Sequence, residues 1–345
     1  MHLPLSAFHH HPRCNLSIII MSEPPSAASL FRAIQAHSLT ELLSSVLHET
    51  SPLGYTLIPS LDEHLSQTRR TSACKRGDVI ELQGPAASGK SHMLYYLLMN
   101  CVLPPSIGSI KLGGWGKAAV LLDTDKKFDV RRFDRLLRSR IKRLLSLDSP
   151  DVEALITKAL DHFHVFQPKS SHQLATTIQH LPMYLATNLP DADLGILAVD
   201  SITAFYWSDR YILEQAHSGD PSSILGLSKT PLNHVFASLQ SLARSHGPLI
   251  LLSSWDLSPP STTQVRRRFD LPPVASNVGK DILPASHHIT LTASSITSGD
   301  CEAVDSEHVR ILPTTCLFGT VRTFGNFSQT TKFVLHITED DVFVP

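Results

Sequence analysis

The chain has 345 residues, of which 42% are hydrophobic and 18% are charged, and its formal net charge is −1. This balance is typical of a globular protein whose core can support one large α/β domain with extensions or two small domains. A net charge near zero excludes a strong overall attraction to nucleic acid or anionic lipid, so any such contact has to come from a local basic patch. The cysteine count, 5, is odd and the spacing is not that of a zinc site, which indicates reduced thiols.

The N-terminal part of the chain lacks a regular pattern of strands and helices. Residues 1–27 are rich in Pro, Ser and His, and we expect a disordered tail there, with Met21 as an alternative start. The apolar run Ile18–Met21 within it is far too short to span a membrane. Residues 28–49 have apolar side chains at helical spacing, which predicts a short helical pair or one helix broken near Ser38. Residues 50–76 are expected to be a loose connector, so residues 28–76 form a helical segment with a linker.

From residue 77 onward, short apolar strands alternate with helices, which predicts an α/β fold with a mostly parallel central sheet covered on both faces. The predicted strands are 78–82, 118–122, 162–166, 194–199 and 248–253, and the predicted helices are 90–101, 128–147, 171–187 and 232–246. After residue 285 only strands are predicted, at 289–292, 309–312, 333–337 and 342–344, as an antiparallel extension that ends in a hairpin. Residues 77–345 are therefore expected to form one domain, with long loops at 217–231 and 256–286.

The most specific chemical signal is the sequence Gly-Pro-Ala-Ala-Ser-Gly-Lys-Ser at residues 84–91. It fits the pattern G-x-x-x-x-G-K-[ST] and lies between a predicted strand and a predicted helix, as a phosphate-binding loop requires. The two glycines let the backbone turn so that successive N–H groups point inward, and the helix adds its positive N-terminal end. Lys90 is expected to bind the β- and γ-phosphates of ATP, and the Ser91 hydroxyl a Mg²⁺ ion. The predicted nucleotide-binding residues are Gly84, Pro85, Ala86, Ala87, Ser88, Gly89, Lys90 and Ser91.

Two other predicted strands end in carboxylates. The strand at 194–199 leads into Asp200, which at the carboxyl end of a parallel strand can face the Mg²⁺ ion held by Ser91. The strand at 118–122 leads into Asp123, Thr124 and Asp125. Asp125 is the candidate catalytic residue, because a carboxylate at that place could orient the attacking water. The alternative is that Asp125 or Asp129 caps the following helix and has no other role.

Basic and aromatic side chains are concentrated at two further places. The predicted helix 128–147 and the residues before it carry Lys126, Lys127, Arg131, Arg132, Arg135, Arg138, Arg140, Lys142 and Arg143. They form either a surface that binds phosphates or a partner, or an ordinary solvated helix face, and the second interpretation is favoured. Tyr206, Trp207 and Tyr211 follow Asp200 and could stack bases or pack against a partner, although core packing is favoured for Trp207.

Several of these segments resemble the RecA-like recombinase family. They are the phosphate loop, the strand Leu121–Asp125 with Phe128 and Asp129 after it, and the run Ala198–Arg210 with Ala-Phe-Tyr-Trp in its middle. Within the family they are similar to eukaryotic recombinase paralogues of the X-ray-repair cross-complementing type, second of their series. The resemblance covers about residues 28–255 and continues beyond them only as a pattern of strands.

The resemblance implies a RecA-like P-loop core that binds ATP between neighbouring protomers. It also implies a nuclear accessory protein without the recombinase's N-terminal DNA-binding domain. Such a protein forms a hetero-oligomer with other paralogues and supports loading of the recombinase on single-stranded or branched DNA. The implied processes are homologous recombination and the repair of double-strand breaks and interstrand cross-links.

Three departures from the recombinases bear on ATP turnover. The family has Glu where this chain has Asp125, and the shorter side chain places the carboxylate on the order of 1 Å from its best position, which can cost roughly a hundredfold in rate. The Gln with which the family senses the γ-phosphate is replaced by Trp255 and Asp256 at the end of the strand 248–253. No clear aromatic-x-x-Ala motif for self-assembly precedes the core. The residues therefore predict ATP binding and leave its hydrolysis open, with a weak DNA-dependent ATPase as the most that they support.

The loop 256–286 corresponds to the one that contacts single-stranded DNA in the recombinases. Here it carries Arg266, Arg267 and Arg268 beside Phe269, which could neutralise phosphates and stack on a base. These arginines are the candidate DNA-binding residues, although a solvated loop explains them equally well. Two other functions stay open from the residues alone. One is a stand-alone P-loop ATPase or kinase with the 256–286 loop as its lid, and the other is an assembly protein in which the phosphate loop is a relic.

Overall fold

The computed structural model describes residues 39, 43, 46, 50–69, 74–145, 151–216, 230–255, 283–295, 315–324 and 326–345. The contacts divide the chain into two units, Met1–Leu47 and His48–Pro345. In the first unit the described residues are Leu39, Leu43 and Val46, which are helical and exposed. The second unit contains every element named below. Among the described residues, no helix is both long enough and apolar enough to cross a membrane.

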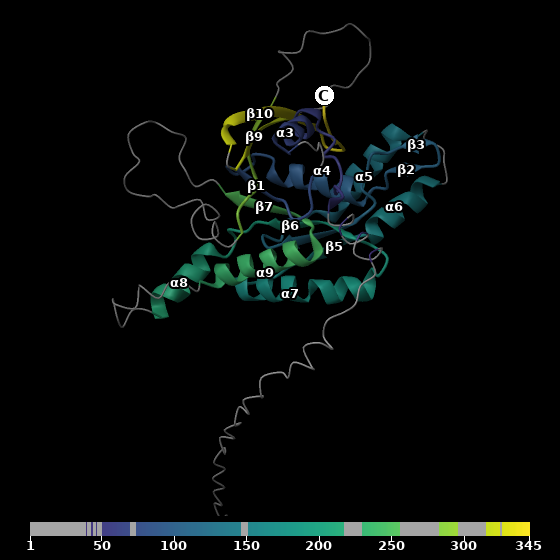
Figure 1. Ribbon diagram of the computed structural model, residues 1–345. Coiled ribbons are helices and arrows are strands. Elements are labelled where there is room, and N and C mark those ends of the chain that lie inside the picture. The colour runs from purple at the N-terminus through teal and green to yellow at the C-terminus, as the bar shows by residue number, and fades with distance from the viewer. Residues whose placement is uncertain are drawn as a thin grey trace, which may run out of the picture. The chain divides into compact units, whose positions relative to one another are not determined.

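A nine-stranded sheet forms the centre of the second unit (Figure 1). The parallel part consists of β1 (Val79–Gly84), β4 (Ala118–Asp123), β5 (Phe163–Phe166), β6 (Leu194–Asp200), β7 (Leu249–Trp255) and β8 (His287–Ser295). The antiparallel part continues from β8 through β9 (Thr315–Thr323) and β10 (Asn326–Ile337) to β11 (Val342–Phe343). The order across the sheet is β11-β10-β9-β8-β1-β7-β6-β4-β5, and a separate ribbon pairs β2 (Ser106–Ile107) with β3 (Ile110–Lys111). The predicted fold class is confirmed, including the antiparallel C-terminal strands and their final hairpin.

Helices cover both faces of the sheet. They are α3 (Pro59–Arg69), α4 (Lys90–Val102), α5 (Val130–Leu144), α6 (Asp151–Asp161), α7 (Ser171–Asn188), α8 (Tyr206–Ala216) and α9 (Pro231–His246). In Figure 1, α7 and α9 lie on one face, and α4 and α5 lie on the other. Side chains of a strand point alternately to the two faces. In β4, Ala119 and Leu121 accordingly join the core under α4 and α5, whereas Val120 and Leu122 join the core under α7 and α9.

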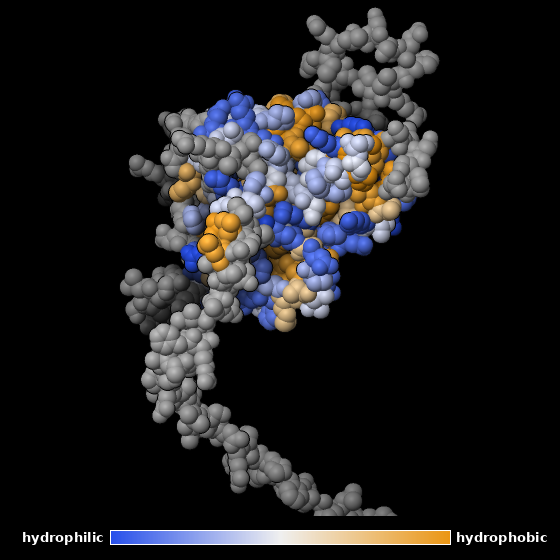
Figure 2. All heavy atoms as spheres, turned by 45° about the vertical axis from the view of Figure 1, so that its right-hand side comes forward, coloured by the Kyte–Doolittle hydropathy of each residue, from blue (hydrophilic) through white to orange (hydrophobic). Residues whose placement is uncertain are grey.

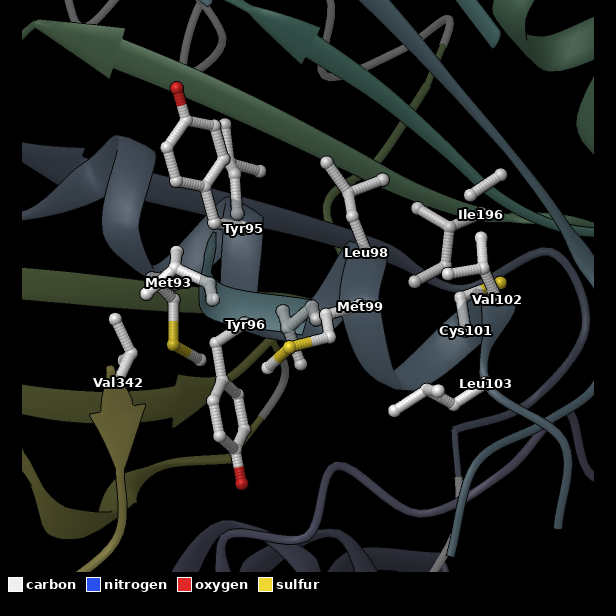
Figure 3. Packing of buried hydrophobic residues seen from close by; sticks show 14 of the residues in the cluster. Met93, Tyr95, Tyr96, Leu98, Met99, Cys101, Val102, Leu103, Ile196 and Val342 are labelled. Carbon is white, nitrogen blue, oxygen red and sulfur yellow. The ribbon is translucent and has the colours of Figure 1, made fainter. Parts of the chain in front are cut away.

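Helix α4 is buried on nearly all sides, which fixes the position of its first residues. Met93 lies beside Val342 of β11, and Val102 lies near Ile196 of β6 (Figure 3). The Tyr96 hydroxyl donates to the carbonyl oxygen of Leu57 at 3.0 Å. A helix that is apolar all round is stable only inside a protein, and α4 packs both against strands of the parallel part of the sheet and against β11 of its antiparallel part. The loop that leads into α4 is therefore held by a rigid element.

Residues 50–76 are not a loose connector, because part of this segment is the helix α3. Leu61 and Leu65, one helical turn apart, are buried in the core. His64, between them, is hydrogen-bonded to the hydroxyls of Thr331 at 2.8 Å and Thr323 at 2.9 Å. The helix begins at Pro59, a residue that is favoured in the first turn. The predicted division into 1–27, 28–76 and 77–345 stays a prediction.

Other predicted elements were displaced or missed. The helix predicted at 128–147 is α5, which ends at Leu144, and a separate helix, α6, follows it. Strand β9 was missed, since Gly319 interrupts its apolar pattern. That glycine is required because the ring of Phe333 lies 2.1 Å from where a Cβ would be. The strand predicted at 309–312, the predicted tail 1–27 and most of the two predicted long loops lie outside the described residues.

Three of the basic residues of α5 contact an acidic turn between β10 and β11, whereas the helix face as a whole stays at least partly exposed, as the favoured interpretation of a solvated face expects. Arg132 donates to the carbonyl oxygen of Thr338 at 2.9 Å and also to that of Glu339. Arg135 forms an ion pair with Glu339 at 3.1 Å, and Arg143 forms one with Asp341. We call these contacts the C-terminal ion-pair cluster.

The surface around this cluster is mixed. Figure 2 brings forward the side of the molecule on which α5 and α6 lie in Figure 1, and hydrophilic and apolar patches alternate there. The cluster holds residues 338–343 against α5 and thereby supports Val342, which packs on α4.

We expect the variant in which Arg132 and Arg135 are both changed to Ala to lose about 1–2 kcal/mol of the free energy of unfolding, because exposed ion pairs contribute little and the bonds to backbone carbonyls contribute more. The loss should shrink at high ionic strength, where surface charges are screened. Denaturant titration at low and high salt measures both effects. Arg131→Ala, an exposed neighbour, is the control, and a control loss equal to that of the double variant would contradict the assignment.

Candidate nucleotide-binding site

The phosphate-loop motif lies where β1 ends and α4 begins, so its predicted structural context is confirmed. We call residues 84–91 the phosphate cradle. Strand β1 lies between β7 and β8 and is parallel to both, which places the cradle at the carboxyl edge of the parallel strands. Open parallel sheets bind their ligands at this edge.

Both glycines of the cradle are required by packing. A Cβ on Gly84 would lie 2.6 Å from the carbonyl oxygen of Leu291 in β8, which is backbone and cannot turn away. Gly89 has φ 88°, a conformation that side chains disfavour, and its Cβ would lie 2.5 Å from the Cδ1 atom of Leu317. The close approach of β8 and β9 to the cradle therefore needs glycine at these two positions.

Lys90 crosses the cradle with its ammonium group. The side chain is buried, and Nζ donates to the carbonyl oxygens of Gly84 at 2.7 Å and Pro85 at 2.8 Å. The first turn of α4 contains no acidic residue, and Gly89, at the N-cap, gives no side-chain cap to that turn. The N–H groups of a helix start that no side chain caps favour an anion, so this site fits the terminal phosphates of a nucleotide.

Asp200 joins the cradle to the neighbouring strands. Its Oδ2 accepts a hydrogen bond from the Ser91 hydroxyl at 3.0 Å, and its Oδ1 accepts one from the Ser253 hydroxyl of β7. A hydroxyl beside a carboxylate offers the hard oxygen ligands that Mg²⁺ prefers. Ser253 was missed by sequence reasoning, although two serines at the end of an otherwise apolar strand are a usable signal.

A magnesium ion at this place would need ligands from outside the protein as well. Among the described residues, no three His, Cys, Asp or Glu side chains are grouped so that they could hold a metal. Mg²⁺ commonly takes one or two protein ligands and completes its shell with substrate phosphates and water. Ser91 and Asp200 together fit that arrangement, whereas a site built from protein ligands alone does not.

The three carboxylates after β4 have different roles. Asp123 is buried and accepts hydrogen bonds from the backbone N–H groups of Lys127 at 3.0 Å and Phe128 at 3.3 Å, so it shapes the turn. Asp129 is the N-cap of α5 and accepts from the N–H groups of Arg131 and Arg132. The capping alternative is therefore met by Asp129, and Asp125 has no part in the cap.

Asp125 lies in a setting that suits a general base. Burial raises the pKa of its carboxyl group, the nearby Lys127 opposes that rise, and the carboxylates of Asp200 and Asp123 add to it. Its position is fixed by the backbone, because the N–H groups of Thr124 and Asp125 donate to the Asp200 carbonyl at 2.9 Å and 3.3 Å. A raised pKa beside a second carboxylate is common at catalytic sites. Asp125 remains a candidate on these grounds.

Two tryptophans near this edge of the sheet are exposed. Trp255, at the end of β7, is aligned with Gly84 in the neighbouring strand, and half of its surface is accessible. Trp207 in α8 is 59% exposed, so the prediction that it packs in the core is wrong. The short α8, which projects beyond α9 in Figure 1, leaves the ring without a core to enter. The Arg210 guanidinium lies 5.8 Å from the Trp207 ring centroid.

The remaining site residues lie outside the described part of the chain. These are Asp256 and the candidate DNA-binding residues Arg266, Arg267 and Arg268. Their assignments stay predictions.

Comparisons with known proteins find similarity to several DNA repair proteins. The chain is 33% identical over 134 residues to DNA repair protein XRCC2 of Mus musculus, a match that covers 39% of this chain and 43% of the relative. It is 26% identical over 194 residues to an XRCC2 homolog of Arabidopsis thaliana, covering 49% of each chain. It is also 25% identical over 232 residues to the DNA repair protein rhp57 of Schizosaccharomyces pombe, covering 66% of this chain and 61% of that one. No protein-family model matches the chain.

The first two matches thus span less than half of each relative's length. Proteins named DNA repair and recombination protein RadA also match, one from Haloquadratum walsbyi at 29% identity over 164 residues, which is 43% of this chain and 44% of the relative. Because the cradle and sheet of this chain have the RecA-like arrangement, the chain is a RecA-like P-loop protein. Within that class, the similarity to XRCC2 proteins and to rhp57 points to the recombinase paralogues of the XRCC2 type, in agreement with the resemblance seen in the sequence.

His92, the residue after Ser91, was not singled out from the sequence and makes the region sensitive to acid. Its Nδ1 atom is buried without a hydrogen-bond partner in the described structure. Burial, with a smaller effect of Arg132, lowers the pKa of His92 to about 4. The neutral imidazole is therefore favoured by folding. Stability from this group is complete above the unfolded pKa of about 6.5 and is lost as the pH falls from there toward about 4.

We expect His92→Gln to remove this part of the acid sensitivity. Between pH 6.5 and 4.5, His92 should contribute a loss of up to about 1.4 kcal/mol of the free energy of unfolding per pH unit. Denaturant titrations at several pH values would show a flatter dependence for the variant than for the unaltered chain. His172→Gln, an exposed histidine on α7, is the control. Equal slopes for the unaltered chain and His92→Gln would contradict the assignment.

Proposed function

We propose that the chain is an ATP-binding accessory protein of homologous recombination and DNA double-strand-break repair, which acts in the nucleus inside a complex of recombinase paralogues. The observation that carries this proposal is the phosphate cradle with Asp200 beside it, in a chain of the XRCC2 type. The complex supports loading of the recombinase on single-stranded DNA, in double-strand-break and interstrand cross-link repair.

In this proposal ATP and Mg²⁺ are the cofactors. The backbone N–H groups of residues 84–91, apart from Pro85, which has none, and the Lys90 ammonium hold the β- and γ-phosphates, and Ser91 and Asp200 hold the metal. When bound, the metal supplies positive charge that neutralises and orients the terminal phosphates. Lys90 already lies over the cradle on two carbonyl oxygens, so it needs only a small movement to reach a phosphate.

The residues around the terminal phosphate favour binding over rapid hydrolysis. Asp125 is shorter than the Glu of the recombinases, and the family's amide sensor is replaced by the half-exposed Trp255. Water positioning and phosphate sensing are both weakened by these changes. We propose that ATP binding serves mainly to organise the contact between neighbouring protomers, with a weak DNA-dependent ATPase at most.

The partners in this proposal are other recombinase paralogues, the recombinase filament, and single-stranded or branched DNA. Arg266, Arg267 and Arg268 are the proposed DNA contacts, because three adjacent guanidinium groups neutralise phosphates and Phe269 offers a stacking ring. Near-zero net charge supports a local patch of this kind over a field of the whole molecule.

The variant Lys90→Ala tests this function in cells from which the gene for this chain has been deleted. We expect it to fail to restore survival after treatment with a DNA cross-linking agent, because the cradle loses its one ammonium group. We also expect the tagged unaltered chain to recover other recombinase paralogues, as detected by mass spectrometry, and Lys90→Ala to recover them less well.

Lys111→Ala, an exposed lysine on β3 away from the cradle, is the matched control and should restore survival fully. Protein levels are compared so that a folding defect is recognised. Full survival with Lys90→Ala at normal abundance would make the cradle a relic. Reproducible absence of paralogues from the recovered material, together with lost ATP turnover in Lys90→Ala, would favour the stand-alone ATPase or kinase instead.

A further inference from the structure

A second lysine lies at the edge of the sheet where the cradle is. The ammonium of Lys127 is 3.6 Å from Asp125 Oδ2 and 5.3 Å from the centroid of the Trp255 ring. Two thirds of this side chain is exposed, whereas the carboxylate of Asp125 is mostly covered. Because β7 and β1 are aligned at Trp255 and Gly84, the ammonium lies above the strand neighbouring the start of the cradle.

The backbone beneath Lys127 is held firmly. Its N–H group donates to Asp123 Oδ1 at 3.0 Å, and Asp123 also accepts from the Gln167 side chain at 3.0 Å. Lys126 has φ 55°, so the chain turns sharply just before Lys127. The turn directs the Lys127 side chain back across the edge of the sheet toward β7, instead of outward along α5. The ammonium therefore has a fixed base and a flexible four-carbon stem.

The charges at this edge favour a further cation outside the cradle. Lys90 is buried and is occupied with the carbonyl oxygens of the loop itself. Asp125 and Asp200 are close enough to influence each other, so the outer side of the cradle is negative. A third phosphate adds negative charge next to these two carboxylates, and an ammonium within reach would add to the metal's positive charge in offsetting it.

We propose that Lys127 binds the terminal phosphate of a nucleoside triphosphate and leaves Asp125 when it does so. When no triphosphate is bound, the ammonium stays beside Asp125 and the Trp255 ring supports it there. This inference rests on the proposed nucleotide binding and goes further, because it assigns a residue that distinguishes triphosphate from diphosphate. A dianionic phosphate attracts an ammonium more strongly than one carboxylate, and the face of an indole ring holds it by a weaker cation–π contact. Lys127 is a positioning and specificity residue here. Its departure also frees the Asp125 carboxylate to accept a hydrogen bond from water.

The first test compares Lys127→Gln with Lys126→Gln. Both variants remove one positive charge from adjacent exposed positions, so a general electrostatic effect would be the same in both. Calorimetry measures the dissociation constants of Mg-ADP and of a non-hydrolysable Mg-ATP analogue. We expect Lys127→Gln to weaken triphosphate binding by on the order of tenfold with little change for diphosphate, and Lys126→Gln to leave their ratio unchanged. Lys127→Arg should keep most of the preference.

The second test uses Trp255 as a reporter. In a Trp207→Phe background, Trp255 is the exposed tryptophan among the described residues, since Trp115 is buried. The triphosphate analogue should change the tryptophan emission because the ammonium leaves the ring, whereas Mg-ADP should change it much less. The additional change Trp255→Phe should abolish the response, which shows that it comes from this ring.

The outcomes separate the two levels of the proposal. If neither nucleotide binds to the unaltered chain, alone or with its paralogue partners, the proposed function itself fails. If both nucleotides bind but Lys127→Gln and Lys126→Gln have the same ratio of dissociation constants as the unaltered chain, only the role of Lys127 is overturned. If both variants weaken triphosphate binding relative to diphosphate binding by the same factor, the effect is one of general charge, and the role of Lys127 is likewise overturned.

Discussion

The Asp200 carboxylate connects three elements that are far apart in the sequence, since Ser91 of α4 and Ser253 of β7 each donate a hydrogen bond to one of its two oxygens at the end of β6. This arrangement exists only because β1, β7, β6 and β4 run parallel and end at one edge of the sheet. Strand β6 ends in Asp200, β7 carries Ser253 near its end, and the turn after β4 carries Asp125. The cradle, the metal ligands and the candidate base are thus all consequences of strand order. The carbonyl oxygen of the same residue receives the N–H groups of the turn after β4, which places Asp125 beside the cradle.

The charged side chains of the chain divide into those engaged in the fold and those left for ligands. Arg132, Arg135 and Arg143 hold the turn before β11, and through Val342 they support the buried helix α4. The run of basic residues on α5 looks alike in the sequence, yet these members act as structural anchors. Lys127 differs because its main partner is a carboxylate of the site itself. What an arginine or lysine does here is decided by its neighbours in space.

The parallel core and the cradle could be predicted from the sequence because both depend on local signals. Buried strands are short apolar runs, and the cradle is a contiguous motif with two glycines. The features that escaped depend on distant partners. Arg132 and Thr338 are separated by 206 positions, and the sequence near either residue does not predict their contact. Strand β9 was hidden because Gly319 is explained only by the Phe333 ring opposite it. Trp207 was assigned to the core, whereas its exposure follows from the position of α8, which projects beyond α9.

The central claim is that residues 84–91, with Asp200, hold the phosphates of a nucleotide. A calorimetric titration of the folded chain, alone and with a paralogue partner, with Mg-ATP tests it most directly. The account predicts saturable uptake of one nucleotide per chain that is lost in Gly84→Ala, because a Cβ at that position collides with the backbone of β8. Absence of any uptake by correctly folded material, in the presence of its partner, would contradict the account.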